Sequence, residues 1–227
     1  YSLKAHDIPD ASLKARGKPI INLLPFAKGE KIATFLILPL TETDWDKYVI
    51  IFATKKGMVR KNKLIDVAKS GKRDLRESGK LSIKLDKLDE LISVKIANPN
   101  QDVLLSTSDG KCLRFPLEKL RLFSGLNSGG VRGIKLTNID YIISQSILNH
   151  SYIDMSIRQD YLKFASENRK NSNDIKNHKF KELNDHEEFL LAVTTKGFGK
   201  RSSAYEYRIS NRGGKGITVI NTTNTAR

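Results

Sequence analysis

A short internal repeat constrains the fold of this chain more than any other feature of its sequence. A threonine, two variable residues, a glycine and then basic residues occur at 54–61, 107–114 and 194–201. An apolar run precedes each copy, at 48–53, 103–105 and 189–193. Glycine permits the positive φ that a tight turn requires. The pattern therefore predicts three β-hairpins, each with basic residues on its second strand.

A second glycine motif follows each hairpin, at 79–85, 130–136 and 214–220, and an earlier copy lies at 17–23. An apolar run then opens the next unit, at 32–40, 91–96 or 141–148. Each unit thus offers four short strands. Repeats of about this length with four strands are typical of radially arranged blades. We therefore predict an all-β, propeller-like fold of repeated four-stranded blades.

The repeat also sets the expected unit boundaries: a partial blade at 1–30, then blades at 31–89, 90–139 and 140–227. Gly57 and Gly110 lie 53 residues apart, whereas Gly110 and Gly197 lie 87 apart. The 34 additional residues fall in a polar insertion at about 149–186. Its segment 153–164 has helical periodicity, and the rest is expected to be a loop or disordered. Since the chain opens on Tyr1, at a point that aligns with a second hairpin strand, we expect a fragment.

The charge of the chain narrows the class of partner. Forty lysines and arginines against 25 acidic residues give a net charge of +15. Such an excess favours nucleic acid or an anionic membrane as partner. The apolar runs are too short to span a bilayer and no lipidation signal is present, so double-stranded DNA is favoured and no membrane is expected. The insertion carries seven basic and six acidic residues, which leaves most of the charge in the repeats.

Basic residues that recur around a curved edge suit duplex DNA, because each neutralised phosphate releases counterions. One set of candidate DNA contacts follows the hairpin glycines: Arg60, Lys61, Lys63, Lys111, Arg114, Lys200 and Arg201. A second set lies near the glycine motifs: Arg16, Lys18, Lys72, Arg73, Arg76, Lys80, Arg132, Arg212 and Lys215. We expect replacement of Arg60, Lys61, Arg114, Lys200 and Arg201 together to weaken DNA binding without unfolding the protein.

Catalytic and metal-binding motifs are lacking. Cys112 is the single cysteine, which excludes an intramolecular disulfide and a multi-cysteine zinc site and fits a reducing cytoplasm. The glycine motifs do not match phosphate-loop spacing, and the four histidines have no ligand spacing. Asp44 and Asp46 flank Trp45 in a loop-like segment rather than in a paired metal site. We expect no catalytic centre, metal or cofactor in this fragment.

Several stretches together resemble the C-terminal domain of the DNA gyrase A subunit, with the related topoisomerase IV domain as a more distant match. They lie at 1–4, 8–11, 15–25, 52–54, 130–136 and 197–201, across the whole chain except the insertion. The resemblance implies a β-pinwheel, a propeller-like disc whose blades exchange strands with their neighbours. It also implies that DNA wraps around the basic rim without sequence specificity, in support of negative supercoiling.

The same resemblance implies partners that lie outside this sequence. They are the gyrase B subunit together with the rest of the gyrase A subunit, in an ATP- and Mg-dependent type II topoisomerase of the bacterial cytoplasm and nucleoid. Residues 212–216, Arg-Gly-Gly-Lys-Gly, match the core of the family's wrapping box. In the aligned order the box itself belongs before Tyr1, so we interpret 212–216 as a box-like copy.

Two other functions remain open at this point. One is a propeller that binds proteins and uses its basic charge for solubility, and the other is an enzyme fragment with its own active site. Affinity that rises with duplex length and falls with salt would favour DNA wrapping over the protein-binding propeller. DNA cleavage or ATP hydrolysis by this fragment alone would be needed to support the enzyme.

Overall fold

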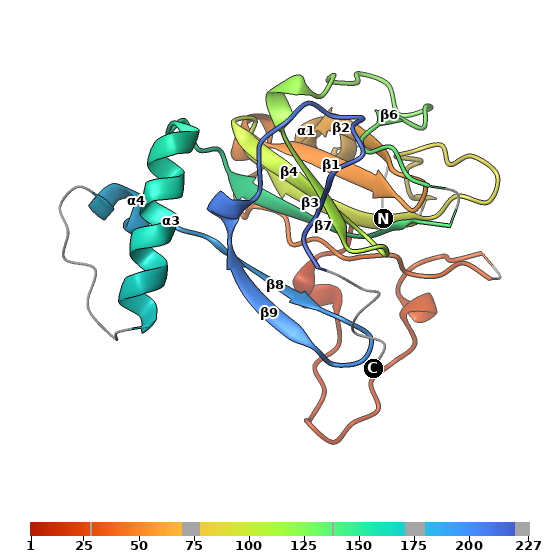
Figure 1. Cartoon of the computed structure of the whole chain (residues 1–227). Helices are drawn as coiled ribbons and strands as arrows, with labels where there is room; N and C mark the ends of the chain where they lie inside the picture. Colours follow the sequence, from red (N-terminus) through yellow and green to blue (C-terminus); the bar gives the residue numbers. More distant parts are fainter. Residues whose placement is uncertain (28, 70–77, 138, 171–179, 221–227) are drawn as a thin grey trace.

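The computed structural model describes the chain except residues 28, 70–77, 138, 171–179 and 221–227 (Figure 1). The strands are β1 Val49–Thr54, β2 Met58–Lys63, β3 Leu91–Ala97, β4 Gln101–Thr107, β5 Lys111–Pro116, β6 Val131–Arg132, β7 Ile142–Asn149, β8 Phe189–Val193, β9 Gly199–Ser203 and β10 Ile217–Thr218. The α-helices are α1 Leu64–Ala68, α3 Met155–Lys170 and α4 Lys181–Asp185. Short 3₁₀ helices lie at Ala5–Asp7, Ile20–Asn22, Glu42–Lys47 (η3), Leu117–Lys119 (η4) and Ala204–Glu206 (η6).

The three predicted hairpins are confirmed as β1–β2, β4–β5 and β8–β9, all antiparallel. Their turn glycines have positive φ: 84° at Gly57, 73° at Gly110 and 83° at Gly197. Each glycine N–H donates to the carbonyl of the repeat threonine three residues earlier, at 3.0 to 3.1 Å. The hydroxyl of that threonine accepts from the N–H of the residue after the glycine. The turn therefore explains why the repeat contains both a threonine and a glycine.

Strand exchange between successive units produces two four-stranded sheets. Their strand orders are β3-β1-β2-β6 and β10-β5-β4-β7, and within the described residues β8 and β9 form a separate pair. Strand β6 follows the second hairpin in sequence but pairs with β2 of the first. Strand β10 follows the third hairpin and pairs with β5 of the second. Each of the first two hairpins thus receives a strand from the unit that follows it, as the resemblance to a β-pinwheel implies.

Two glycines allow these exchanged strands to approach the hairpins. A Cβ on Gly130, where φ is 93°, would lie 2.3 Å from the Val59 carbonyl oxygen. A Cβ on Gly216, where φ is 76°, would lie 2.7 Å from the Cys112 carbonyl oxygen. Gly130 and Gly216 are therefore equivalent. This corrects the alignment of the sequence motifs, which had matched Gly214 with Gly130.

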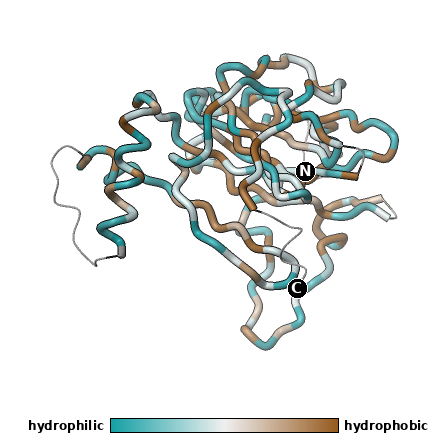
Figure 2. Tube along the Cα trace, viewed as in Figure 1, coloured by the Kyte–Doolittle hydropathy of each residue, from teal (hydrophilic) through white to brown (hydrophobic). Residues whose placement is uncertain are grey.

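The sheets stack face to face and share a core. Val49, Ile51 and Val59 of one sheet pack against Val103 and Phe115 of the other in a single buried cluster. A second cluster covers the opposite face of the first sheet, and a third joins the second sheet to the hairpin β8–β9 and the residues after it. Many of the apolar segments lie along these strands (Figure 2). Both four-stranded sheets are consequently covered on both faces.

Three expected strands are not found. Segment 17–23 contains the 3₁₀ helix Ile20–Asn22, and segments 32–40 and 79–85 have no strand pairing in the described structure. Phe35 and Ile37 are exposed. A strand requires a neighbour to complete its backbone hydrogen bonds, and no described strand pairs with these segments. Since each four-stranded sheet takes strands from more than one predicted unit, the boundaries at 30, 89 and 139 remain a proposal.

The described part of the insertion has more helix than its sequence suggested. Helix α3 extends to Lys170, beyond the predicted 153–164, and α4 follows residues 171–179, which lie outside the described structure. Tyr161 and Ala165 of α3 pack against Phe180 and Leu183 in a buried cluster that Tyr205 also contacts. The insertion is therefore a small helical unit attached to the segment that follows β9 (Figure 1).

The single cysteine provides a probe of this core. Cys112 is buried, and burial raises the pKa of its thiol, which keeps the thiolate population small. We expect Cys112 to react much more slowly than free glutathione with a disulfide reagent in the native protein and at a comparable rate in denaturant. Rapid reaction of the native protein would contradict the packing of β10 against β5.

Candidate nucleic-acid interface

Three of the predicted DNA contacts lie inside the protein. Arg60, Lys61 and Arg114 have only 0%, 8% and 2% of their surfaces exposed. The expectation that these side chains lie on an exposed rim was wrong. Replacing them with alanine would remove interior contacts, so the five-residue variant is not expected to fold normally.

Arg60 fastens β2 to the segment that leads into the exchanged strand β6. Its guanidinium donates to the side chain of Asn62 at 2.8 Å, to the hydroxyl of Ser128 at 2.9 Å, and to the carbonyl oxygens of Gly125 and Ser128. It also lies 5.0 Å from the centroid of the Phe123 ring. The charge is thus surrounded by acceptors, most of them from a segment more than 60 residues away.

Lys61 occupies a similar interior position. Its ammonium donates to the Leu117 carbonyl oxygen at 2.6 Å, and burial lowers its pKa. The backbone carbonyl of Lys61 accepts from the N–H of Phe123 at 2.8 Å. Lys61 therefore joins the first sheet to the 3₁₀ helix η4 that follows β5.

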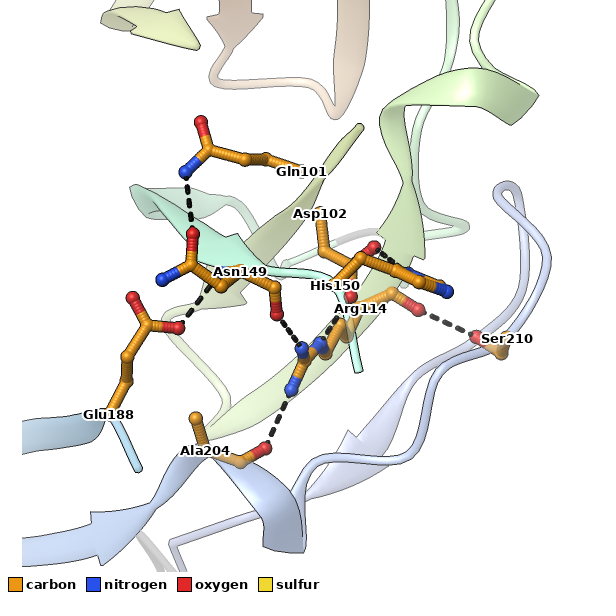
Figure 3. A network of polar contacts seen from close by, with 8 residues as sticks. All are labelled: Gln101, Asp102, Arg114, Asn149, His150, Glu188, Ala204 and Ser210. Atoms are coloured by element: carbon orange, nitrogen blue, oxygen red, sulfur yellow. Dashed lines mark hydrogen bonds and ion pairs between the residues drawn. The ribbon is translucent and has the colours of Figure 1, made fainter. Parts of the chain in front are cut away.

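Arg114 lies at the centre of a polar network that joins the second and third units (Figure 3). Its Nε donates to Asp102 at 2.7 Å, while its terminal nitrogens donate to the carbonyl oxygens of Ala204 at 2.7 Å and Asn149 at 2.8 Å. The other carboxylate oxygen of Asp102 lies 2.7 Å from Nδ1 of His150. Because Asp102 is fully buried, the Arg114 guanidinium provides the charge that a buried carboxylate requires.

Arg60, Lys61 and Arg114 are buried because β2 and β5 lie in the interior of their sheets. Strands β2 and β5 each have a strand on both sides, and the faces of their sheets are covered by neighbouring clusters. Successive side chains of a strand point to opposite faces of its sheet, and in such a strand both faces are buried. In β2 this holds for Val59, Arg60, Lys61 and Asn62. Position after the hairpin glycine therefore did not identify the exposed side chains.

The remaining sequence candidates differ in exposure. Lys80 donates to the carbonyl oxygens of Asp66 and Lys69, and Lys111 pairs with Asp109 at 2.7 Å. The Arg201 guanidinium lies 4.7 Å from the centroid of the Phe189 ring. Lys72, Arg73 and Arg76 lie outside the described residues. The exposed candidates are Arg16, Lys18, Lys63, Arg132, Lys200, Arg201, Arg212 and Lys215.

Four exposed basic residues gather where two glycine motifs meet, and we name them the junction cluster: Arg132, Lys135, Arg212 and Lys215. The backbones that carry them are hydrogen-bonded. The Gly213 N–H donates to the Gly133 carbonyl oxygen at 2.6 Å, and the Lys135 N–H donates to the Gly214 carbonyl oxygen at 2.8 Å. Sequence reasoning missed Lys135, although it follows Arg132 by three residues in the same motif.

The junction cluster is a region of uncompensated positive charge. Nη1 of Arg212 donates to the backbone carbonyl of Arg132 at 3.1 Å. Within the part of the chain that the structure describes, none of the four side chains forms an ion pair with an acidic group. The side chains of such a cluster can donate hydrogen bonds to phosphate oxygens without first breaking a salt bridge.

Two other kinds of site have no candidate among the described residues. No described helix is long and apolar enough to cross a membrane. Nor do the described histidines, cysteines and acidic residues gather in threes as a metal ion would require. Trp45, between the two aspartates considered for metal, is buried and donates its indole N–H to the Pro39 carbonyl oxygen at 2.8 Å.

Parts of the chain that contain the repeat match a known protein family. The model of the DNA gyrase C-terminal domain, a beta-propeller, matches residues 1–39, 101–144 and 188–226, more than half of the chain. The chain belongs to this family. The three matched stretches contain the glycine motif at 17–23, the second and third hairpins, and the glycine motifs of the junction cluster. The junction cluster is thus carried by a gyrase C-terminal domain.

Curated relatives place this domain within longer proteins. The chain is 39% identical over 229 residues to the DNA gyrase A subunit of Rickettsia bellii, and 37% identical over 246 residues to that of Granulibacter bethesdensis. These alignments cover 96% and 97% of the chain but only 25% and 26% of the relatives. The chain therefore spans about a quarter of the length of these relatives.

Solved structures support the fold. A DNA gyrase A C-terminal domain superposes with a TM-score of 0.66 at 21% identity, over 96% of this chain and 55% of that one. A topoisomerase IV C-terminal domain gives 0.65 at 20% identity, over 94% and 53%. The β-pinwheel with exchanged strands is accordingly the fold of this chain.

Proposed function

We propose that this domain binds duplex DNA without sequence specificity and bends it around a basic surface that includes the junction cluster. The observation that carries the proposal is the meeting of Arg132 and Lys135 with Arg212 and Lys215, all exposed and without acidic partners among the described residues. The net charge of +15 and membership of the gyrase C-terminal domain family support it.

The proposed contacts are electrostatic and require no particular base sequence. Lysine and arginine side chains that neutralise phosphates release counterions, and this contribution is the same for all duplexes. Exposed residues of other units, namely Arg16, Lys18, Lys63, Lys200 and Arg201, would extend the basic surface beyond the junction cluster. Contacts at several units would reward a bent duplex over a straight one, because bending brings more phosphates within reach.

In the whole protein, we propose that this domain supports negative supercoiling as part of a gyrase A subunit that acts with a gyrase B subunit. The ATP and Mg that the reaction uses would bind elsewhere in that assembly. A bacterial cytoplasm, with the enzyme on the nucleoid, is the corresponding location.

Fluorescence anisotropy with duplexes of increasing length tests the proposal. Wrapping predicts that affinity rises with length until the basic surface is filled, and that log K falls linearly with log salt, by about 0.9 per phosphate neutralised. A short duplex that binds as tightly as a long one would contradict wrapping. Binding that is insensitive to salt would instead favour a protein-binding propeller that uses its charge for solubility.

A further inference from the structure

A cavity of about 250 Å³ lies between the insertion and the segment that follows β9. One face of α3 lines it with Met155, Arg158 and Leu162, whose spacing of three and four residues places them side by side. Tyr205 of η6 and Arg208 line the opposite side. Tyr161 and Ala165, elsewhere on α3, are packed in the core of the insertion. The cavity therefore does not belong to that core.

Arg158 gives the cavity an unusual charge. Its Nε and Nη1 atoms are buried and have no hydrogen-bond partner within the described residues. It forms no ion pair there either, although Asp154 and Asp102 lie near enough to act on it electrostatically. Burial and the neighbouring Arg114 both lower its pKa, in that order, yet a guanidinium remains protonated under any ordinary condition. A permanent cation thus lies beside the cavity, and two of its donor nitrogens are buried without a described partner.

The other residues that line the cavity also favour binding of an anion. Arg208 is exposed and adds a second guanidinium, and Gln159, also exposed, adds amide donors. Met155, Leu162 and Tyr205 supply apolar surface. The one carboxylate of the wall, Glu206, is exposed and pairs with neither arginine in the described structure. Two arginines against one carboxylate leave the described walls with a positive charge.

From this geometry we infer that the cavity between α3 and η6 binds a phosphate group through Arg158 and Arg208. Guanidinium groups bind phosphate strongly, because their N–H groups match its oxygens in direction and spacing. The phosphate could be supplied by the DNA backbone or by a free phosphate compound, and both offer the same oxygens. If the duplex supplies it, which rests on the proposed DNA binding, the DNA path reaches the insertion.

The test compares the whole chain with its Arg158→Met and Arg208→Gln variants in two assays. The first is the salt dependence of duplex binding. The second is the shift in melting temperature caused by inorganic pyrophosphate. Lys163→Met is the matched control, because Lys163 is exposed on the same helix but does not line the cavity. Arg208 is exposed, so Arg208→Gln is expected to fold. It therefore still tests the inference if Arg158→Met does not fold.

A backbone phosphate in the cavity predicts that each arginine variant weakens duplex binding several-fold and reduces the salt slope by about 0.9, whereas Lys163→Met has a smaller effect. A free phosphate compound predicts instead that pyrophosphate raises the melting temperature of the parent chain, that the arginine variants lose this shift, and that duplex binding is unchanged. Equal behaviour of the parent chain and both arginine variants in both assays would overturn the inference. If the parent chain bound no duplex, the proposed function would fail, and pyrophosphate alone would decide the inference.

Discussion

Arg114→Met is expected to lower the free energy of unfolding by about 3–5 kcal/mol, because it leaves the buried carboxylate of Asp102 without its main cationic partner. The substitution also removes the donors to the carbonyl oxygens of Ala204 and Asn149, which join the second unit to the third. Denaturant unfolding followed by circular dichroism measures the change.

Lys111→Met is the matched control for this prediction. Lys111 lies on the same strand and also forms an ion pair, with Asp109, but that pair is exposed to water. Exposed ion pairs contribute little to stability, so we expect a much smaller change. If the two variants lost similar stability, the network around Arg114 would not have the structural role assigned to it.

Gly130→Ala is expected to destabilise the domain by about 2–6 kcal/mol, from left-handed backbone strain and overpacking together. The new methyl group would lie 2.3 Å from the Val59 carbonyl oxygen, so β6 would have to move away from β2. Thermal or denaturant unfolding measures the loss. Because β6 leads into Lys135, we also expect weaker DNA binding from the protein that remains folded.

Gly125→Ala serves as the control for Gly130→Ala. Gly125 lies in the same connection, but a Cβ there would meet no atom within 4 Å and its φ is not in the left-handed region. We expect little change in stability. Normal stability of Gly130→Ala would contradict the close approach that permits strand exchange.

The hairpins could be predicted from the sequence because their determinants are local. The threonine and glycine of each turn contact each other within four residues, so the motif itself contains the information. The pairing partners of the exchanged strands β6 and β10 could not be predicted from residue patterns alone. Each exchanged strand has only two residues, and its partner lies more than 70 residues earlier in the chain.

The site was only partly predictable, for a related reason. Arg60, Lys61 and Arg114 are basic residues on hairpin strands, which made them candidates for DNA contacts. Their burial depends on sheets and loops contributed by distant segments. Arg132, Arg212 and Lys215 were predicted individually as DNA contacts, and that role stays a prediction. That they lie together, and with Lys135, follows from the pairing of their backbones across 80 residues.

The insertion illustrates the limit of arguments from net charge. Its charge of +1 pointed away from a role in binding, because paired and unpaired charges count equally in such a sum. In the structure Arg169 pairs with Glu187, whereas Arg158 has buried donors without described partners. An individual unpaired arginine can therefore mark a site in a segment that is nearly neutral.

DNA binding by the junction cluster is tested most directly by replacing Arg132, Lys135, Arg212 and Lys215 with alanine and measuring duplex affinity across a range of salt. The control replaces four other exposed basic residues, Lys87, Lys95, Lys119 and Arg121, and so removes the same charge. We expect the junction variant to lose up to about 3.6 from the slope of log K against log salt, with normal folding, and the control to lose much less. Equal losses in the two variants, or full affinity in the junction variant, would contradict the assignment of the DNA surface.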